Sequence, residues 1–262
     1  MASRELIAFN TALESDNKIH DDDVARRFGF TGGLVPGVDV YAYLAWGPAE
    51  AWGRAWLERG VMQARFRMPA YDGETVTTDF DASTGRLALL NQRGVEVADG
   101  SASLPPERAA RPDLTRFPVA PLPAERPAAS AEALVAGTVL GNWDVDFRAA
   151  TAAAYLADVR EVLPIYSELA VAHPGWVLRL ANRILAGNVT LGPWIHVGST
   201  VTHHGLVGDG ARVSCRGTVT QEYEHKGHRF VQLDLGVFAD DELAAVIDHT
   251  AIYLPRQVAE LE

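Results

Sequence analysis

Cysteine is almost absent from this sequence of 262 residues. The single cysteine, Cys215, cannot form an internal disulfide bond. No uninterrupted apolar segment reaches the roughly 18 residues that a membrane-spanning helix needs, and residues 1–7 lack the apolar core of a secretory signal. These absences exclude a disulfide scaffold and a helical membrane protein, and we expect a cytoplasmic protein in a reducing environment.

Positive charge is also scarce in this chain. The 23 lysines and arginines face 34 aspartates and glutamates, which gives a formal net charge of -11. This balance disfavours the phosphate backbone of nucleic acid as a partner, although a small anionic ligand could still bind in a local basic pocket. The glycines do not form a phosphate-binding loop either, because the lysine and hydroxyl residue of such a loop are missing.

Proline is concentrated in one part of the sequence. Half of the 14 prolines lie between Pro105 and Pro127, in a segment rich in alanine and arginine that shows neither helical nor strand periodicity. Such a composition is typical of a linker. We therefore predict an N-terminal half at 1–104, a linker at 105–130 and a C-terminal half at 131–262.

The two halves carry similar landmarks in the same order, which predicts an internal duplication. The landmarks are Pro36-Gly37 with Pro174-Gly175, Asp72-Gly73 with Asp209-Gly210, and Leu104-Pro105 with Leu254-Pro255, at shifts of 138, 137 and 150 residues. A longer hairpin in the second half would account for the larger third shift. Each of the first two pairs is a common turn signal, so the order of the landmarks is what supports the duplication.

Each half also shows an apolar helix followed by strands. The predicted helices span 38–57, with a kink or break at Gly47-Pro48, and 176–184. The predicted strands are 61–68, 75–80 and 86–90 in the first half, and 195–202, 213–222, 229–238 and 244–254 in the second. Asp72-Gly73 and Asp99-Gly100 are predicted turns between strands. A helix covering one face of an antiparallel sheet makes each half an α+β layer.

Polar residues gather just before the first helix. His20 follows Asn17 by three residues and Asp16 by four, and Gly37 stands at the start of the apolar stretch. Polar side chains beside free backbone N–H groups suggest acid/base chemistry on a carbonyl compound. A simpler interpretation stays open, in which His20 only precedes a solvated helix start formed by the acidic run 21–23 and the glycines only permit a turn.

Residues 15–20, Ser-Asp-Asn-Lys-Ile-His, together with the glycine-rich stretch 32–37, resemble the motif of the MaoC-like (R)-specific enoyl-thioester hydratases and dehydratases. The resemblance implies a tandem (double) hot-dog fold, in which each half is a long central helix wrapped by an antiparallel sheet. It also implies a lyase of fatty acid metabolism that acts on an enoyl or 3-hydroxyacyl thioester. No metal or redox cofactor is implied, since coenzyme A or a carrier protein only carries the substrate.

In this family a motif of the form Asp-x-Asn-Pro-x-His supplies an aspartate and a histidine that handle water and its proton. A glycine N–H at the start of the central helix polarises the thioester carbonyl. The motif's histidine, asparagine and glycine fall on His20, Asn17 and Gly37. The sequence departs from the motif at its aspartate, where Ser15 stands and Asp16 follows. It also has lysine at the motif's proline and Pro36 where histidine is common before the glycine.

The resemblance gives each candidate residue a role. We expect His20 to act as acid/base, Asp16 to supply the carboxylate, Asn17 to orient the loop and the Gly37 N–H to bind the oxyanion. The expected substrate-binding residues are Ser15, Pro36, Val38, Arg65 and Arg67, with the two arginines as contacts for the phosphates of coenzyme A. The second half lacks the motif, so we expect it to be structural and the chain to have one active site.

Two other functions stay open. A hot-dog thioesterase would need a carboxylate facing the thioester from the central helix, and Glu50 lies far along that helix. A non-catalytic acyl-binding or partner subunit would fit the loss of the motif aspartate at Ser15. In each case the expected partner is a small-molecule acyl thioester, and a homodimer is an alternative to a monomer.

The second half contains a histidine-rich strand and a basic turn. His196, His203 and His204 do not predict a metal site, because neighbouring strand residues face opposite ways and no cysteine or paired carboxylate stands at ligand spacing. This strand could instead line the substrate tunnel. The basic cluster 225–229 is predicted as a hairpin turn, with contact to coenzyme A phosphates as an alternative.

Overall fold

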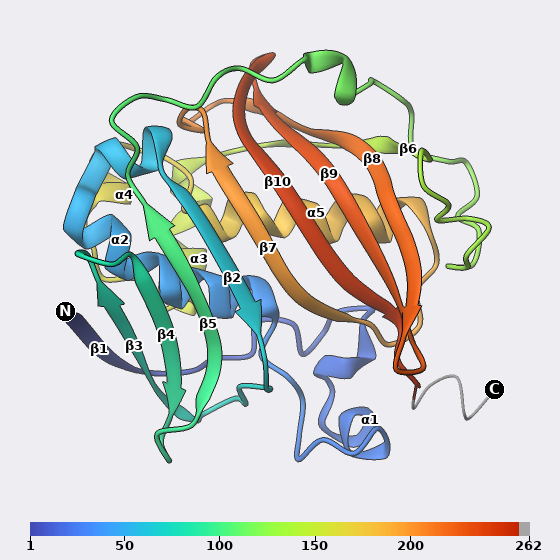
Figure 1. The fold of residues 1–262 in the computed structure, drawn as a ribbon, viewed down its shortest axis with the longest axis horizontal. Coiled ribbons are helices and arrows are strands. Elements are labelled where there is room, and N and C mark those ends of the chain that lie inside the picture. Colours follow the sequence, from blue (N-terminus) through green and yellow to red (C-terminus); the bar gives the residue numbers. More distant parts are fainter. Residues whose placement is uncertain (257–262) are drawn as a thin grey trace.

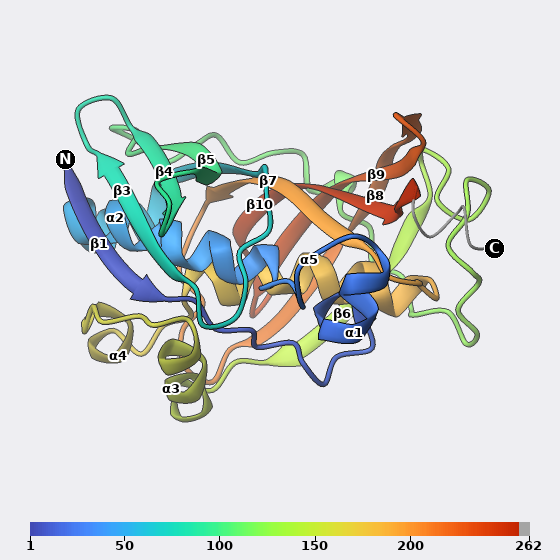
Figure 2. The same cartoon turned by 90° about the horizontal axis from the view of Figure 1, so that it is seen from below.

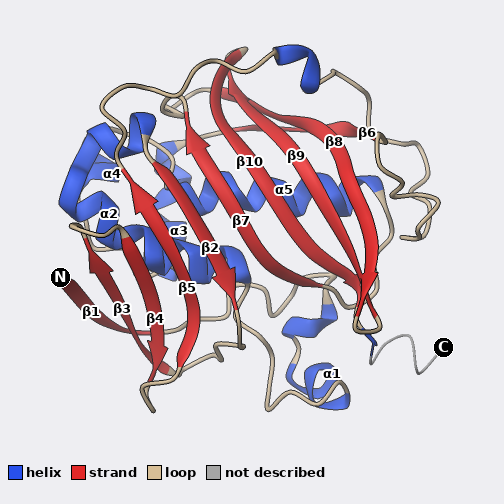
Figure 3. Ribbon diagram, in the orientation of Figure 1, coloured by secondary structure: helices blue, strands red, loops and turns tan. Residues whose placement is uncertain are grey.

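The computed structural model describes residues 1–256. Ten strands form one continuous antiparallel sheet in the order β1-β3-β4-β5-β2-β7-β10-β9-β8-β6, and the long helices lie against one face of it (Figure 3). The strands are β1 (Ala2–Ile7), β2 (Val61–Phe66), β3 (Thr75–Asp81), β4 (Arg86–Asn91), β5 (Glu96–Ser103), β6 (Val139–Asp146), β7 (Ile195–His203), β8 (Arg212–His225), β9 (His228–Ala239) and β10 (Glu242–Leu254). The helices are α1 (Asp22–Arg27), α2 (Gly37–Arg59), α3 (Ala149–Asp158), α4 (Ile165–Glu168) and α5 (Pro174–Asn188), with short 3-10 turns at Lys18–His20 and Leu114–Arg116.

The sheet consists of two similar halves joined in the middle. Strands β1 to β5 lie over α2, and strands β6 to β10 lie over α5 (Figure 1). The junction is the antiparallel pair β2 and β7, in which Val61 is opposite Thr202 and Arg65 is opposite Gly198. This is the tandem arrangement of helix and sheet that the sequence predicts. Helices α3 and α4 lie on the side of α2 that faces away from the sheet (Figure 2).

Helix α2 is the core element of the first half, and its run 38–49 is buried throughout. Of the kink or break predicted at Gly47-Pro48, the break is wrong, because the helix continues through that pair. The residue with non-helical angles is Gly53, with φ 54° and ψ -142°. Glycine adopts this positive φ without the strain that a Cβ would cause. Gly47 serves packing instead, since a Cβ there would lie 2.4 Å from Cβ of Phe80.

Helix α5 crosses α2 closely near its first turn. A Cβ on Gly175 would lie 2.7 Å from Cβ of Ala42, so glycine at this position lets the two helices approach each other. The helix starts at Pro174, two residues before its predicted start. Proline suits the first turn, where its missing N–H would have no helical acceptor. The two central helices therefore form one core beneath the joined sheet.

The predicted strands correspond to β2, β3 and β4 in the first half and to β7 to β10 in the second. Strands β1 and β6 at the two edges of the sheet, and β5 within it, were not predicted. The turn predicted at Asp99-Gly100 is wrong, because both residues lie inside β5. A Cβ on Gly100 would lie 2.0 Å from the carbonyl oxygen of Gln63, so this glycine permits close approach of β2. Among residues 1–256, no helix is both long enough and apolar enough to cross a membrane.

Candidate functional site

Asn17 anchors the loop that carries the family-like motif. Its side-chain Oδ1 accepts hydrogen bonds from the N–H of Ile19 at 3.4 Å and from the N–H of Trp194 at 3.2 Å. Its Nδ2 donates to the carbonyl of Trp194 at 3.0 Å. Trp194 directly precedes β7, so Asn17 caps a turn of its own loop and also ties that loop to the second half of the chain.

His20 has its tautomer set by its neighbours. Nδ1 lies 2.6 Å from the carbonyl oxygen of Leu34, and because a carbonyl only accepts, Nδ1 carries the proton. Nε2 lies 3.4 Å from Nδ2 of Asn17, which is a donor. Burial lowers the pKa of His20 below 6.5, although the bond to Leu34 and the charge of Asp39 oppose this shift. His20 is therefore neutral near pH 7, with a lone pair on Nε2.

Two cavities meet at His20. The larger, about 740 Å³, lies between the loop 11–17 and α5, and the smaller, about 280 Å³, lies between α2 and the strands β2 and β7. The residues that line both are Asn17, His20, Pro36, Asn182 and Trp194. These volumes are in the range of small-molecule sites. His20 thus stands at the passage between a polar space and a largely apolar one.

Gly37 begins α2 beside the smaller cavity. No side chain caps this helix start. The N–H groups of Asp39 and Val40 donate to the carbonyl of Pro36, so those of Gly37 and Val38 are the ones available to a ligand. A Cβ on Gly37 would lie 2.9 Å from Nδ1 of His196 and 3.1 Å from the ring of Phe66. Glycine is therefore the residue that fits between these side chains while leaving the helix start open.

Four of the other predicted residues lie on the larger cavity, and the two arginines lie elsewhere. Ser15, Asp16, Pro36 and Val38 line the larger cavity together with His20. Oγ of Ser15 donates to the carbonyl of Asn17 at 3.2 Å, within the same loop.

The two predicted arginines lie on the sheet, where both are paired with the same carboxylate. Nη2 of Arg65 lies 2.7 Å from Asp99, and Nε of Arg67 lies 2.8 Å from it. Arg67 also lines the smaller cavity. Arg65 lines none of the cavities described here, so the structure does not bring it to His20.

A buried ion pair that the sequence prediction missed connects the two central helices. Asp39, in the first turn of α2, is fully buried, and its Oδ1 lies 2.7 Å from Nη2 of Arg179 on α5. Thr11 donates to the other oxygen of Asp39 at 2.6 Å. Burial opposes the charged guanidinium, but Asp39 outweighs it and raises the pKa of Arg179. The sequence offered one signal for this pair, because Asp39 is the single charged residue in the run 38–49 and a buried charge needs a partner.

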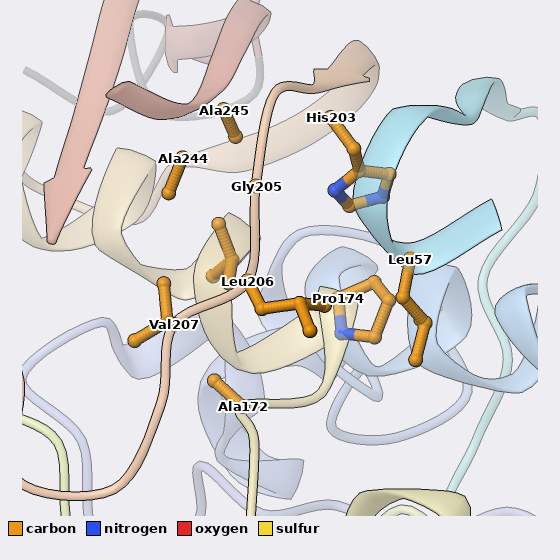
Figure 4. Close-up of a pocket in the computed structure, with 10 residues that line it drawn as sticks. Leu57, Ala172, Pro174, His203, Gly205, Leu206, Val207, Ala244 and Ala245 are labelled. Atoms are coloured by element: carbon orange, nitrogen blue, oxygen red, sulfur yellow. The ribbon is translucent and has the colours of Figure 1, made fainter. Parts of the chain in front are cut away.

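The helix start of the second half is closed by side chains. Nδ1 of His173 accepts from the N–H of Gly175 at 3.0 Å, and its Nε2 lies 3.1 Å from Oε2 of the buried Glu161. A Cβ on Gly175 would lie 2.4 Å from the hydroxyl of Tyr155. The nearby cavity, which Pro174 and His203 help to line, has only about 10 Å³, room for about one water (Figure 4). Of the two central helix starts within residues 1–256, that of α2 is the one that borders a ligand-sized space.

The donor set does not suggest a metal centre. Within residues 1–256, no group of three or more His, Cys, Asp or Glu side chains is arranged to hold a metal ion.

The acidic run 21–23 is a solvated helix start, in which Oδ1 of Asp21 accepts from the N–H groups of Asp23 and Val24.

Comparison with solved structures shows the fold. A MaoC-like dehydratase has a TM-score of 0.61 and 10% identity, covering 97% of this chain and 98% of its own. A Mycobacterium tuberculosis protein with a double hot-dog fold has a TM-score of 0.61 and 16% identity, covering 96% of each chain. A candidate oleoyl thioesterase from Lactobacillus plantarum has a TM-score of 0.52 and 12% identity, covering 97% and 95%.

The predicted resemblance in fold is confirmed, since the chain has the double hot-dog architecture of these proteins along nearly its whole length. No protein-family model matches the sequence, and no curated protein matches it. At identities this low, the comparison shows the fold alone, and the reaction is argued from the site.

Proposed function

We propose that this protein is a hydratase or dehydratase acting on an acyl thioester, with His20 as its acid/base group. The observation that carries the proposal is the neutral His20, whose Nε2 lone pair lies at the junction of two cavities. The uncapped start of α2 borders the same space. A base and an oxyanion donor on one ligand-sized space are what hydration of a conjugated thioester requires.

In the hydration direction, Nε2 of His20 takes a proton from water while the water oxygen bonds to the β-carbon. The electron pair of the double bond moves toward the thioester carbonyl, and the N–H of Gly37 stabilises the negative charge on its oxygen. The α-carbon then receives the proton that His20 took from water, either directly from His20 or relayed through the carboxylate of Asp16, so that both groups return to their starting state. Dehydration is the reverse sequence.

The two cavities suggest how the substrate lies. Arg126 and Arg183 line the larger cavity and offer positive charge to the phosphates of a carrier such as coenzyme A, whereas Arg179 on the same cavity is paired with Asp39. The acyl chain would occupy the smaller cavity, whose lining includes Val40, Phe66, Met68 and Ile252. In this arrangement the phosphates bind to arginines of the larger cavity, which were not predicted, and not to the predicted Arg65 and Arg67.

The thioesterase alternative lacks a free carboxylate that faces either cavity from α2. Asp39 is bonded to both Arg179 and Thr11, and Glu50 is exposed near the middle of α2. We therefore favour hydration over hydrolysis.

The test is the hydration of crotonyl-coenzyme A by the wild type and by a set of loop variants. Asp16→Asn should lower kcat by about 10- to 100-fold if this carboxylate takes part in proton transfer. The double variant Ser15→Asp with Asp16→Asn restores the carboxylate at the motif position and should recover activity. Glu14→Gln, on the same cavity, is the matched control and should change kcat little.

Two outcomes would contradict the proposal. Full activity in both His20→Ala and Asp16→Asn would remove the proposed site. Absence of turnover by the wild type, with butyryl-coenzyme A still bound, would favour a non-catalytic acyl-binding protein.

A further inference from the structure

Three buried polar side chains of the second half form a chain that ends at the start of α2. Nε2 of His196 on β7 lies 2.8 Å from Oγ of Ser199, and the same oxygen lies 3.0 Å from Nδ1 of His249 on β10. All three residues are buried, at 6%, 5% and 1% exposure. Buried polar side chains are costly unless they are satisfied, so a chain of three calls for an explanation.

Both ends of this chain lack a partner. Nδ1 of His196 and Nε2 of His249 are buried and make no hydrogen bond among the described residues. His196 lines the smaller cavity together with His20 and Gly37. Its Nδ1 would lie 2.9 Å from a Cβ on Gly37, and its ring packs edge-on against Phe66 at 4.8 Å. The free end at His196 therefore faces the open helix start.

The two rings are neutral. Burial lowers the pKa of His196 well below 6.5, and the neighbouring His249 adds to this shift. Burial also lowers the pKa of His249 to about 3. Each neutral ring carries one N–H, and Ser199 has a single hydroxyl proton to donate. If the Ser199 hydroxyl donates to Nε2 of His196, the ring proton of His196 is on Nδ1. If the hydroxyl donates to Nδ1 of His249 instead, the ring proton of His196 is on Nε2 and its Nδ1 is a bare acceptor.

We propose that His196 binds the substrate, with its Nδ1–H donating to the acyl carbonyl oxygen beside the N–H groups of α2, and that Ser199 and His249 hold this tautomer. The inference deepens the proposed function and rests on it. The second half then supplies part of the active site. Asn182 of α5 supports this contribution from the second half. Its side-chain Oδ1 is also buried without a partner among the described residues, and the residue lines both cavities.

The first experiment compares two buried histidines of the same strand. His196→Phe keeps an aromatic ring against Phe66 and removes the hydrogen bond, so kcat/KM for crotonyl-coenzyme A should fall about 100-fold, as for loss of one oxyanion donor. His203→Phe is the matched control. His203 is also buried on β7 but packs on Trp56, and its replacement should change kcat/KM by less than about 3-fold.

The second experiment uses the wild type and so does not depend on whether a variant folds. Nitrogen-15 NMR of the histidine rings, with and without butyryl-coenzyme A, reports the tautomer and hydrogen bonding of His196. Binding should shift the Nδ1 resonance toward that of a bonded N–H. Ser199→Ala should leave the ring in mixed tautomers and lower kcat/KM by about 5- to 10-fold.

The outcomes separate the two proposals. Normal turnover by His196→Phe, or a ring resonance that butyryl-coenzyme A leaves unchanged although it binds, would overturn the role of His196 alone. Failure of the wild type both to hydrate crotonyl-coenzyme A and to bind butyryl-coenzyme A would overturn the proposed function, and the inference with it.

Discussion

The two central helices start with the same Pro-Gly pair but in opposite surroundings. At Gly37 the helix start is uncapped and borders a cavity of about 280 Å³. At Gly175 the imidazole of His173 takes the backbone N–H, Tyr155 fills the adjacent space, and the nearest cavity has about 10 Å³. The same Pro-Gly pair therefore borders an open cavity in one half and a packed core in the other.

This difference shows how a duplicated fold can divide its tasks. In the first half, the only hydrogen-bonding neighbour of Nε2 of His20 within residues 1–256 is the Asn17 amide at the long distance of 3.4 Å, and His20 lines both cavities. In the second half, both ring nitrogens of His173 are hydrogen-bonded, one to the N–H of Gly175 and the other to Glu161. The side chains around a helix start, and not the helix start itself, decide whether its N–H groups can bind a ligand.

The largest effect should come from the histidines beside the two helix starts. We expect His20→Ala to lower kcat for crotonyl-coenzyme A about 1000-fold, because general acid–base catalysis typically contributes 10²- to 10⁴-fold. Its unfolding midpoint in urea should stay close to that of the wild type, since a cavity-lining side chain contributes little to the core. Equal loss of stability and activity would mean that His20 is structural.

The counterpart, His173→Ala, should reverse this pattern. Burial opposes ionisation of Glu161, yet His173 and the N–H groups of Val162 and Leu163 together outweigh it and lower the pKa of that carboxyl. Removing His173 leaves a buried carboxylate without its partner, which should cost about 3 kcal/mol of unfolding free energy in urea titrations. The folded fraction should keep its kcat. A selective fall in kcat would place a second active site in this half.

Acidification should lower the free energy of unfolding, because the second half contains buried neutral histidines. Burial lowers the pKa values of His196, His203 and His249, those of the last two to about 4 and about 3. The unfolded chain therefore binds more protons below pH 6.5, and stability is complete above pH 6.5 and falls as the pH drops toward these values. The three groups together should cost about 2 kcal/mol between pH 7.5 and 6.0.

Urea titrations at the two pH values measure this loss. The variant His203→Phe removes one of the three groups and should reduce the pH dependence by about a third. An unchanged slope in that variant would show that His203 does not titrate on unfolding as its burial requires.

The smallest effect should come from adding a methyl group at each helix start. Gly37→Ala places Cβ against His196 and Phe66 beside the open cavity, and we expect about a 10-fold loss of kcat/KM with little loss of stability. Gly175→Ala meets the Tyr155 hydroxyl and Ala42 in a packed core, so it should cost about 1 to 2 kcal/mol and leave kcat unchanged. Thermal unfolding and initial rates on both variants check the contrast.

Much of the fold was predictable because it rests on local signals. Alternating strands, apolar helices and the repeated Pro-Gly pair predicted the tandem arrangement, and the structural comparison confirms it. The errors arose where glycine serves packing and not a turn. Gly47 lies against Phe80 and Gly100 against β2, so neither position ends its element.

The site was predictable only in its first-half members. The spacing of Asp16, Asn17 and His20 brought these residues to attention, and the structure places all three on the larger cavity. The buried pair of Asp39 and Arg179 was missed, because its two members are 140 positions apart and only their helices bring them together.

The sequence by itself determined the duplicated architecture and the loop that carries His20, since both follow from short-range periodicity and spacing. Tertiary structure alone decided that the start of α2 is open while that of α5 is closed, and that His196 faces Gly37. These features depend on side chains from distant strands and helices meeting in one place, and whether a polar group is bonded or left free is fixed only by that meeting.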